Sequence, residues 1–244
     1  MKKNILSALT VGVLFVSTSV FAQITVGPKI GYNLSSIKEK VITSGTGFSN
    51  NGDIKNNSGF NVGAMMNAQM GKYFSIRPEL LYNQAGFKYT STDTYGNSIT
   101  TSDYTANYSY LSIPVNFVGH LPLGDNFKIQ GIIGLTTSFG LGGKLKTTVS
   151  NGSSSASNNT NIKMKKDPDV VGDDTYYLNG LDMGINYGIG CQYKAFVFSA
   201  VYNMGVSNTE SHYSNQKYED KRGADYKQYN KSMSFSVAYL FGGK

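Results

Sequence analysis

Hydrophobic and polar residues alternate with a period of two along most of this chain, which is typical of β-strands with one apolar and one polar face. The clearest case is residues 178–193, where apolar side chains from Leu181 to Tyr193 alternate with small or polar ones from Gly180 to Gln192. The same alternation predicts eight strands, at residues 24–34, 59–70, 74–87, 108–119, 127–141, 178–193, 196–205 and 232–241. The fold class predicted is all-β.

The connections between these strands alternate strictly between short and long. The short ones lie at residues 71–72, 122–126 and 194–195, and the long polar ones lie near 35–57, 89–107, 142–177 and 206–231. Outer-membrane barrels have this arrangement, with short periplasmic turns at one end and long outer loops at the other. It predicts an eight-stranded antiparallel up-and-down transmembrane β-barrel in the outer membrane. The tract 151–161 has low complexity and is expected to be mobile.

A soluble barrel with the apolar rows inside is the competing architecture. Four glycines on the polar row, Gly180, Gly184, Gly188 and Gly190, favour the membrane barrel, because they leave room for other side chains in a narrow lumen. Aromatic residues lie near many strand ends, as expected for interfacial girdles; they are Tyr32, Phe60, Phe74, Phe127, Tyr193, Phe196, Tyr239 and Phe241. Pro28, Pro78 and Pro114 fall within strands and predict bulges or local bends.

The first 22 residues have the layout of a cleaved signal peptide. Lys2 and Lys3 precede an apolar run from Ile5 to Val16, and cleavage is expected after Ala22. The alternative is a membrane anchor, but the run is short of the roughly 20 residues that a spanning helix needs. The predicted domains are therefore the signal peptide, 1–22, and the barrel, 23–244.

The mature chain is moderately basic. Its formal charge falls from +7 to +5 once Lys2 and Lys3 are removed, and the remaining basic residues form no stripe suited to nucleic acid. The expected partners of this charge are anionic lipid head groups or lipopolysaccharide, and the alternative is ordinary solvated loop charge. Cys191, the single cysteine, excludes a disulfide framework and is expected to pack as a small hydrophobe.

Four segments resemble a known family of outer-membrane barrels common in Bacteroidetes, often labelled porin-like or PorT-type. They are SIRPELLYNQAG at 75–86, YLSIPVNF at 110–117, LDMGINYGIGCQYKAF at 181–196 and SFSVAYLF at 234–241. The resemblance implies an eight-stranded barrel whose last strand, here Val237 to Phe241, is recognised by the barrel-assembly machinery. The chain departs from that pattern in its tail, Gly242 to Lys244. The resemblance also implies an accessory role in protein secretion across the outer membrane.

Candidate chemistry is sparse. Seven polar residues are expected to project into the lumen, where they either form a charged constriction or, in so narrow a barrel, pair and plug it; they are Arg77, Glu79, Lys128, Gln130, Asp182, Asn186 and Gln192. His120 and His212 fall at opposite ends of the barrel and cannot share a site. Neither the loop group Glu210, Ser211, His212 and Ser214 nor the acidic group Asp167, Asp169, Asp173 and Asp174 has the spacing of a catalytic or calcium site.

These observations predict a non-enzymatic barrel with no catalytic residues, cofactor or metal. The leading hypothesis is that its long extracellular loops contact unknown protein partners or serve envelope structure. The alternatives are the secretion role that the resemblance implies and a narrow solute pore, which requires the lumen charges to line water.

Overall fold

The computed structural model describes residues 23–41, 53–96, 98–152, 154–165, 175–211 and 226–242. The predicted signal peptide, 1–22, lies outside these residues. The strands are β1 Gln23–Val41, β2 Asp53–Met70, β3 Phe74–Tyr95, β4 Ser98–Pro122, β5 Phe127–Ser150, β6 Ser155–Met164, β7 Thr175–Leu178, β8 Leu181–Tyr193, β9 Phe196–Gly205 and β10 Tyr226–Tyr239. No helix in the described part is long and apolar enough to cross a membrane.

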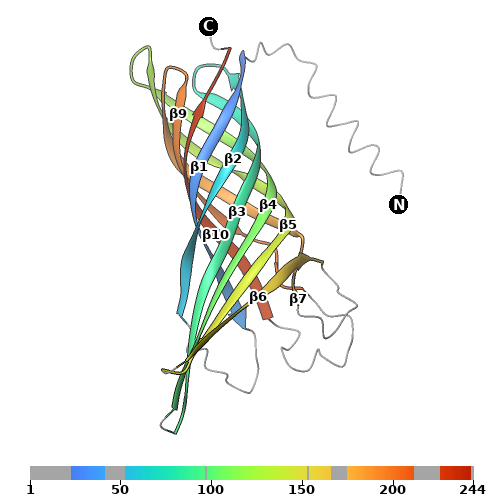
Figure 1. Cartoon of the computed structure of the whole chain (residues 1–244). Helices are drawn as coiled ribbons and strands as arrows, with labels where there is room; N and C mark the ends of the chain where they lie inside the picture. The colour runs from blue at the N-terminus through green and yellow to red at the C-terminus, as the bar shows by residue number, and fades with distance from the viewer. Residues whose placement is uncertain are drawn as a thin grey trace, which may run out of the picture.

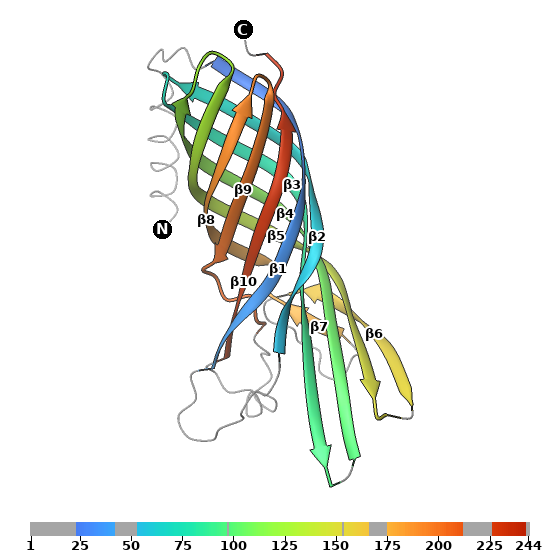
Figure 2. The ribbon, with the colours of Figure 1, turned by 90° about the vertical axis from the view of Figure 1, so that its left-hand side faces the viewer.

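Eight of these strands close into a ring, as predicted. The order is β4-β3-β2-β1-β10-β9-β8-β5, and pairing between β4 and β5 completes the circle. Neighbouring strands of the ring are antiparallel. The three short turns and the two ends of the barrel domain lie together at the top of Figure 1, here called the short-turn end. The long connections lie at the opposite end, the long-connection end (Figures 1 and 2).

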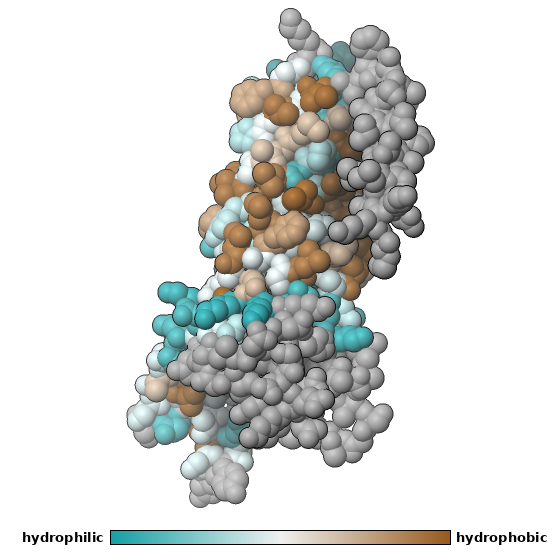
Figure 3. All heavy atoms as spheres, turned by 90° about the vertical axis from the view of Figure 1, so that its right-hand side faces the viewer, coloured by the Kyte–Doolittle hydropathy of each residue, from teal (hydrophilic) through white to brown (hydrophobic). Residues whose placement is uncertain are grey.

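The wall is apolar outside and polar inside. Ile133, Leu135 and Ile189 are 61%, 64% and 70% exposed, whereas Arg77 and Gln130, on the inward rows, are 2% and 1% exposed. This polarity is the reverse of a soluble barrel, so the soluble alternative is wrong. The outward apolar side chains form a belt, one side of which Figure 3 shows. The belt is made by the outward rows of residues 24–32, 60–70, 74–82, 111–121, 129–141, 181–193, 196–204 and 233–241. Each segment has at least the roughly 9 to 11 residues that a tilted membrane strand needs.

Aromatic side chains gather at both ends of this apolar belt, as predicted. At the short-turn end, the Tyr239 ring lies 5.0 Å from Phe196 and 4.8 Å from Phe241 between centroids. At the other end the rings of Phe60 and Tyr82 lie 5.9 Å apart. Amphipathic rings at these two levels suit the two faces of a bilayer.

The strand prolines do not produce the bulges expected of them. The register runs unchanged past Pro28, Pro78 and Pro114, and pairing lapses for two residue pairs beside each one. The missing N–H is accommodated by a local gap in the ladder. The bulges lie elsewhere, between Asn56 and Asn61 of β2 and at Ser109/Tyr110, where β4 meets β5.

The long connections are shorter than predicted, because strands continue into them. β3 and β4 stay paired out to Tyr95 and Ser98, well beyond the apolar belt, so 89–107 is mostly a hairpin. The tract 151–161, expected to be mobile, contributes most of β6, which pairs with β5. These segments are mostly polar, with apolar residues scattered on both faces, so they lack the alternation that marks strands of the belt. Pairing between these strands satisfies their backbone N–H and C=O groups, although the segments lie outside the apolar belt.

A small apolar core stabilises the long-connection end. It contains seven buried side chains, Ile37, Phe87, Ala106, Tyr108, Tyr110, Ile162 and Leu178, with Leu145 and Met164 packed against them. β7 lies parallel to β6 and brings in Leu178, which is fully buried. We call this group the outer core. Its members from β1, β3 and β4 lie on the inward rows of the wall at that end.

Candidate functional site

The lumen of the barrel is the only place where the predicted polar candidates come together among the described residues. Alternate residues of each wall strand point inward, and most of these inward side chains are Asn, Ser, Thr or Gln. The charged members are few: Lys29, Arg77, Glu79 and Asp182 are all buried. Because a buried polar group is costly unless it is paired, the hydrogen bonds of this set decide what the lumen does.

A layer of polar side chains blocks the lumen near the short-turn end. The Arg77 guanidinium donates to Gln130 Oε1 at 3.1 Å and to Asn67 Oδ1 at 3.3 Å. Ser75 Oγ bonds Asn67 Oδ1 at 2.8 Å and lies 2.8 Å from His120 Nε2. We call these five residues, Asn67, Ser75, Arg77, His120 and Gln130, the plug layer. They come from β2, β3, β4 and β5, so the layer crosses half of the ring.

An ion pair and a chain of amides fill the middle of the lumen. Lys29 Nζ donates to Glu79 Oε2 at 2.6 Å, and it is the one salt bridge among the described residues. Asn116 Nδ2 lies 3.4 Å from Glu79 Oε1 and its own Oδ1 accepts from Asn186 at 2.9 Å. Asn203 Nδ2 donates to Asn186 Oδ1 at 2.7 Å and so extends this series of amide contacts. These contacts run across the lumen and along it, so they rigidify the barrel from inside.

Asp182 belongs to a separate group of hydrogen bonds beside the outer core. Its carboxylate accepts from Ser207 Oγ and Asn230 Nδ2, each at 2.9 Å. Asn230 also accepts from the Tyr108 hydroxyl at 2.8 Å and donates to the Tyr110 hydroxyl at 3.1 Å. The two tyrosine rings belong to the outer core and meet edge to face, 5.6 Å apart. The apolar core and the polar lumen therefore share a boundary with few unpaired groups.

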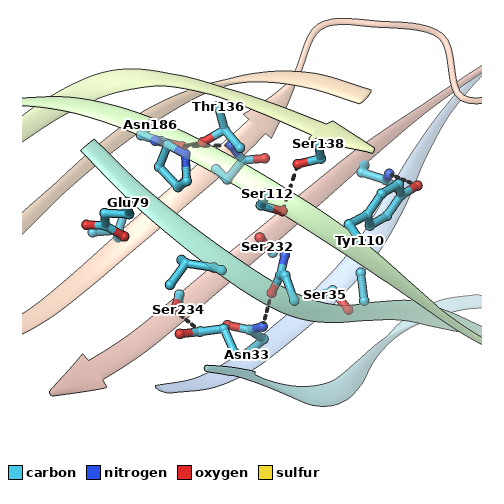
Figure 4. Close-up of a pocket in the computed structure, with 18 of the residues that line it drawn as sticks. Asn33, Ser35, Glu79, Tyr110, Ser112, Thr136, Ser138, Asn186, Ser232 and Ser234 are labelled. Carbon is cyan, nitrogen blue, oxygen red and sulfur yellow. Dashed lines mark hydrogen bonds between the residues drawn. The ribbon is translucent and has the colours of Figure 1, made fainter. Parts of the chain in front are cut away.

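A small hollow lies between the plug layer and the outer core (Figure 4). It has a volume of about 80 Å³ and is lined by Lys29, Glu79, Asn116, Asn186 and other inward residues. That volume holds a few water molecules and no larger solute. An open vestibule of about 560 Å³ lies at the short-turn end, where Lys128 and Gln192 line it. Arg77 and Gln130 line neither space and separate the two.

One lumen glycine shows why the inward row of β8 carries small residues. A Cβ placed on Gly184 would lie 2.6 Å from Asn203 Nδ2. The missing side chain therefore makes room for the amide that bonds Asn186. The prediction that glycines leave space for lumen side chains is confirmed at this position.

The predicted lumen residues are placed inward, with different degrees of burial. Arg77, Glu79, Gln130, Asp182 and Asn186 are buried, and Lys128 and Gln192 are partly exposed at the vestibule. The sequence alone did not single out Lys29 or the inward asparagines that complete the network; these are Asn33, Asn61, Asn67, Asn116, Asn203 and Asn230. The sequence feature that could have identified these asparagines is their position on the polar row of a strand.

The remaining candidates do not form a site in the described part of the chain. Ser211 Oγ donates to the Lys165 carbonyl at 2.7 Å, and Glu210 is buried in a bridge with Leu178. His212, Ser214 and the four aspartates at 167, 169, 173 and 174 lie outside the described residues. Within those residues, no three His, Cys, Asp or Glu side chains gather as metal ligands would.

Comparison with known proteins agrees with this architecture. A family model described as the outer membrane protein beta-barrel domain matches residues 19–211. No curated protein matches the chain.

Three solved structures are similar to the chain at low identity. The attachment invasion locus protein Ail of Yersinia pestis is 15% identical over 89% of this chain and 98% of its own, with a TM-score of 0.33. OprG from Pseudomonas aeruginosa is 10% identical over 91% and 97%, with a TM-score of 0.38. Neisserial surface protein A is 10% identical over 88% and 97%, with a TM-score of 0.33. Similarity at this level carries no argument about binding or activity.

Proposed function

The chain belongs to the outer membrane protein beta-barrel domain family. We propose that its lumen is a structural plug while its extracellular end binds a protein partner. The apolar belt crosses the outer membrane, and the short-turn end faces the periplasm. No catalytic role is proposed for any residue.

The observation that carries this proposal is a rigid sheet standing outside the membrane. Beyond the apolar belt, β3, β4, β5 and β6 remain paired side by side, out to Tyr95, Ser98, Ser150 and Ser155. Figure 2 shows the two hairpins projecting from the barrel. The outer core anchors the base of this sheet. Insertion into a bilayer needs only the belt, so an ordered extension of this size is better explained by contact with a partner.

The sheet tip has the exposure that a binding surface needs. Ile99 is 58% exposed close to the β3–β4 turn, and Val149, near the end of β5, is 40% exposed. Tyr89 and Tyr104 lie on the same face as Val149, opposite to that of Ile99, with their ring centroids 5.8 Å apart. Tyr89 also packs against the outer core. Aromatic and aliphatic groups on a rigid support are the usual centre of a protein interface.

A shortened hairpin tests this proposal. Replacing residues 92–101 by Asn-Gly leaves the Ser91–Ser102 pair in register and removes no side chain of the outer core. The variant should insert normally, because the belt is intact, and should keep the gel mobility of a folded barrel before boiling. A photo-crosslinking side chain at position 99 should give a discrete protein adduct on living cells. The same group at the lipid-facing position 133 is the control and should give none.

Two outcomes would contradict the proposal. The first is a shortened variant that no longer inserts, which would make the tip part of folding. The second is an absence of discrete protein adducts from position 99 and from the neighbouring tip positions.

A role in secretion of the PorT type is the second candidate, favoured by the four segments that resemble that family. Two of those segments pair with each other, since Pro78 and Val115 lie opposite across β3 and β4. A deletion strain should then secrete fewer proteins across the outer membrane. An unchanged set of secreted proteins would exclude this role.

A solute pore is the candidate that the lumen favours least. The plug layer and the outer core lie on either side of the small central hollow. We expect planar-bilayer recordings of the intact protein to show no conductance. Conductance that changes on Arg77→Ala or Glu79→Ala would restore the pore hypothesis.

A further inference from the structure

Four lysines gather on the outward face of the wall, just beyond the extracellular edge of the apolar belt. They are Lys88 of β3, Lys144 and Lys146 of β5, and Lys163 of β6, and all four are exposed. Lys88 and Lys146 lie in one row, on either side of Thr105 of β4. Lys144 pairs with Asn161, two residues from Lys163. We call these four residues the lysine band.

A β-bulge is what directs two of these lysines outward. Gly140 pairs with Tyr110 and Gly142 with Ser109, so Leu141 is an extra residue on β5. A bulge shifts the alternation of the strand by one position. Odd-numbered residues face outward up to Leu141, and even-numbered Lys144 and Lys146 do so beyond it. Gly142, with φ of 109°, supplies the left-handed backbone for this change.

Lys144 lies close to the level of the head-group layer of the outer leaflet, and Lys146 and Lys88 lie farther out along their strands. Leu141, 60% exposed, is the last belt residue of β5. Strands that rise about 3.4 Å per residue and tilt by about 40° place Lys144 about 8 Å farther out. The head-group region adds roughly 5 to 7 Å on each side of the hydrocarbon, and a lysine side chain can reach back toward it. Figure 3 shows hydrophilic side chains in a band directly beside the belt.

The charge of this surface is poorly balanced by the protein itself. Within the described residues, no carboxylate lies within 4 Å of the amino groups of Lys88, Lys144 or Lys146. Two aspartates lie in the row of Thr90, two residues farther out than Lys88: Asp53 of β2 pairs with Thr90, and Asp103 of β4 accepts a hydrogen bond from Thr90 Oγ1. Clustered like charges on neighbouring strands repel each other. An anion from the surroundings would relieve that repulsion.

We propose that the lysine band docks the phosphate groups of outer-leaflet lipids. A lipid phosphate offers several acceptor oxygens and negative charge at the level of these amino groups, and ammonium groups pair well with it. The bilayer is the source of the phosphate, because the apolar belt holds the band beside it. This inference does not rest on the proposed protein partner, since it uses the outward face at the membrane rather than the sheet tip.

The test compares two variants of the full barrel. K88Q/K144Q/K146Q removes three charges of the lysine band but keeps polar side chains. K72Q/K194Q is the matched control, because Lys72 and Lys194 are exposed in turns at the opposite end of the barrel. Each folded protein, in zwitterionic detergent, is titrated with bis-phosphorylated lipid A, and bound molecules are counted by native mass spectrometry. Gel mobility before and after boiling checks that each variant is folded.

The wild type and the control should bind lipid A equally, and the triple variant should bind it roughly a hundredfold more weakly, at about fivefold per lysine. Inorganic phosphate at millimolar concentration should not displace the lipid. Equal affinity in the triple variant would overturn the inference, as would equal binding of dephosphorylated lipid A. If inorganic phosphate displaced the lipid completely, the conclusion that the bilayer supplies the bound phosphate would be overturned. If the triple variant does not fold, K144Q alone should show the fivefold loss, and no loss would overturn the inference.

Discussion

Removing the positive partner of the buried ion pair is the sharpest test of a sealed lumen. In Lys29→Met the side chain keeps its length but loses its charge, and Glu79 keeps a carboxylate that is only 3% exposed. Its remaining hydrogen bond comes from Asn116 Nδ2 at 3.4 Å, which is long for such a contact. The carboxylate would then be buried almost without compensation.

The expected loss of stability follows from that geometry. Breaking a buried pair by removing one partner costs about 3–5 kcal/mol, because the other charge stays in a medium of low dielectric. This corresponds to more than a hundredfold in the folding equilibrium. Lys29→Met/Glu79→Gln removes both charges and keeps the hydrogen bond to Asn116, so it should recover most of the loss. Lys72→Met, at an exposed turn, is the control and should change stability by less than about 0.5 kcal/mol.

The measurement is unfolding by guanidinium from lipid vesicles, with the folded fraction read from gel mobility without boiling. The chain has no tryptophan, so fluorescence would depend on its 18 tyrosines. A loss below about 1 kcal/mol in Lys29→Met would mean that water or salt screens Glu79. The sealed lumen would then be wrong. A double variant no more stable than Lys29→Met would refute the electrostatic explanation.

Three further predictions address other parts of the molecule. Leu178→Ala should lower the free energy of unfolding by about 2–5 kcal/mol, because it leaves a cavity in the outer core. The extracellular sheet should then be cleaved faster by a protease. Unchanged proteolysis would show that the outer core does not stabilise this sheet. Gly184→Ala should lower stability by about 1–3 kcal/mol through its contact with Asn203, whereas Gly119→Ala, which meets open space, should not; equal effects would contradict the packing argument. N-terminal sequencing of the mature protein should begin at Gln23, and a chain that still starts at Met1 would exclude cleavage.

Much of the barrel was predictable because its environment imposes a simple pattern. Each strand of the belt touches hydrocarbon on one face and packed polar groups on the other, so its residues alternate strictly, as Leu181 to Tyr193 do. The number of ring strands, the sorting of short and long connections and the inward direction of Arg77 and Asp182 all follow from that alternation. The prolines predicted bulges or local bends, and the bulges lie elsewhere, because a missing N–H identifies a weak point in the ladder but does not require an extra residue there.

Beyond the apolar belt the alternation disappears, and the predictions for the long connections were wrong there. β6 reads as a polar low-complexity tract, since strands wetted on both faces need no alternation. Its position depends on Ile162 packing into a core with Phe87 and Leu178, residues far apart in the chain. The bulge at Leu141 also depends on the partner strand, since only pairing with Ser109 and Tyr110 shows the extra residue.

The sequence by itself thus determined the architecture and the membrane-facing surface, because a two-residue period and the thickness of a bilayer are local constraints on each strand. The tertiary structure alone decided how the polar side chains of the lumen pair and that the lysine band exists. Both depend on which side chains meet across strands, as Lys29 meets Glu79. That choice is made by register and strand pairing, which no single segment of the chain encodes.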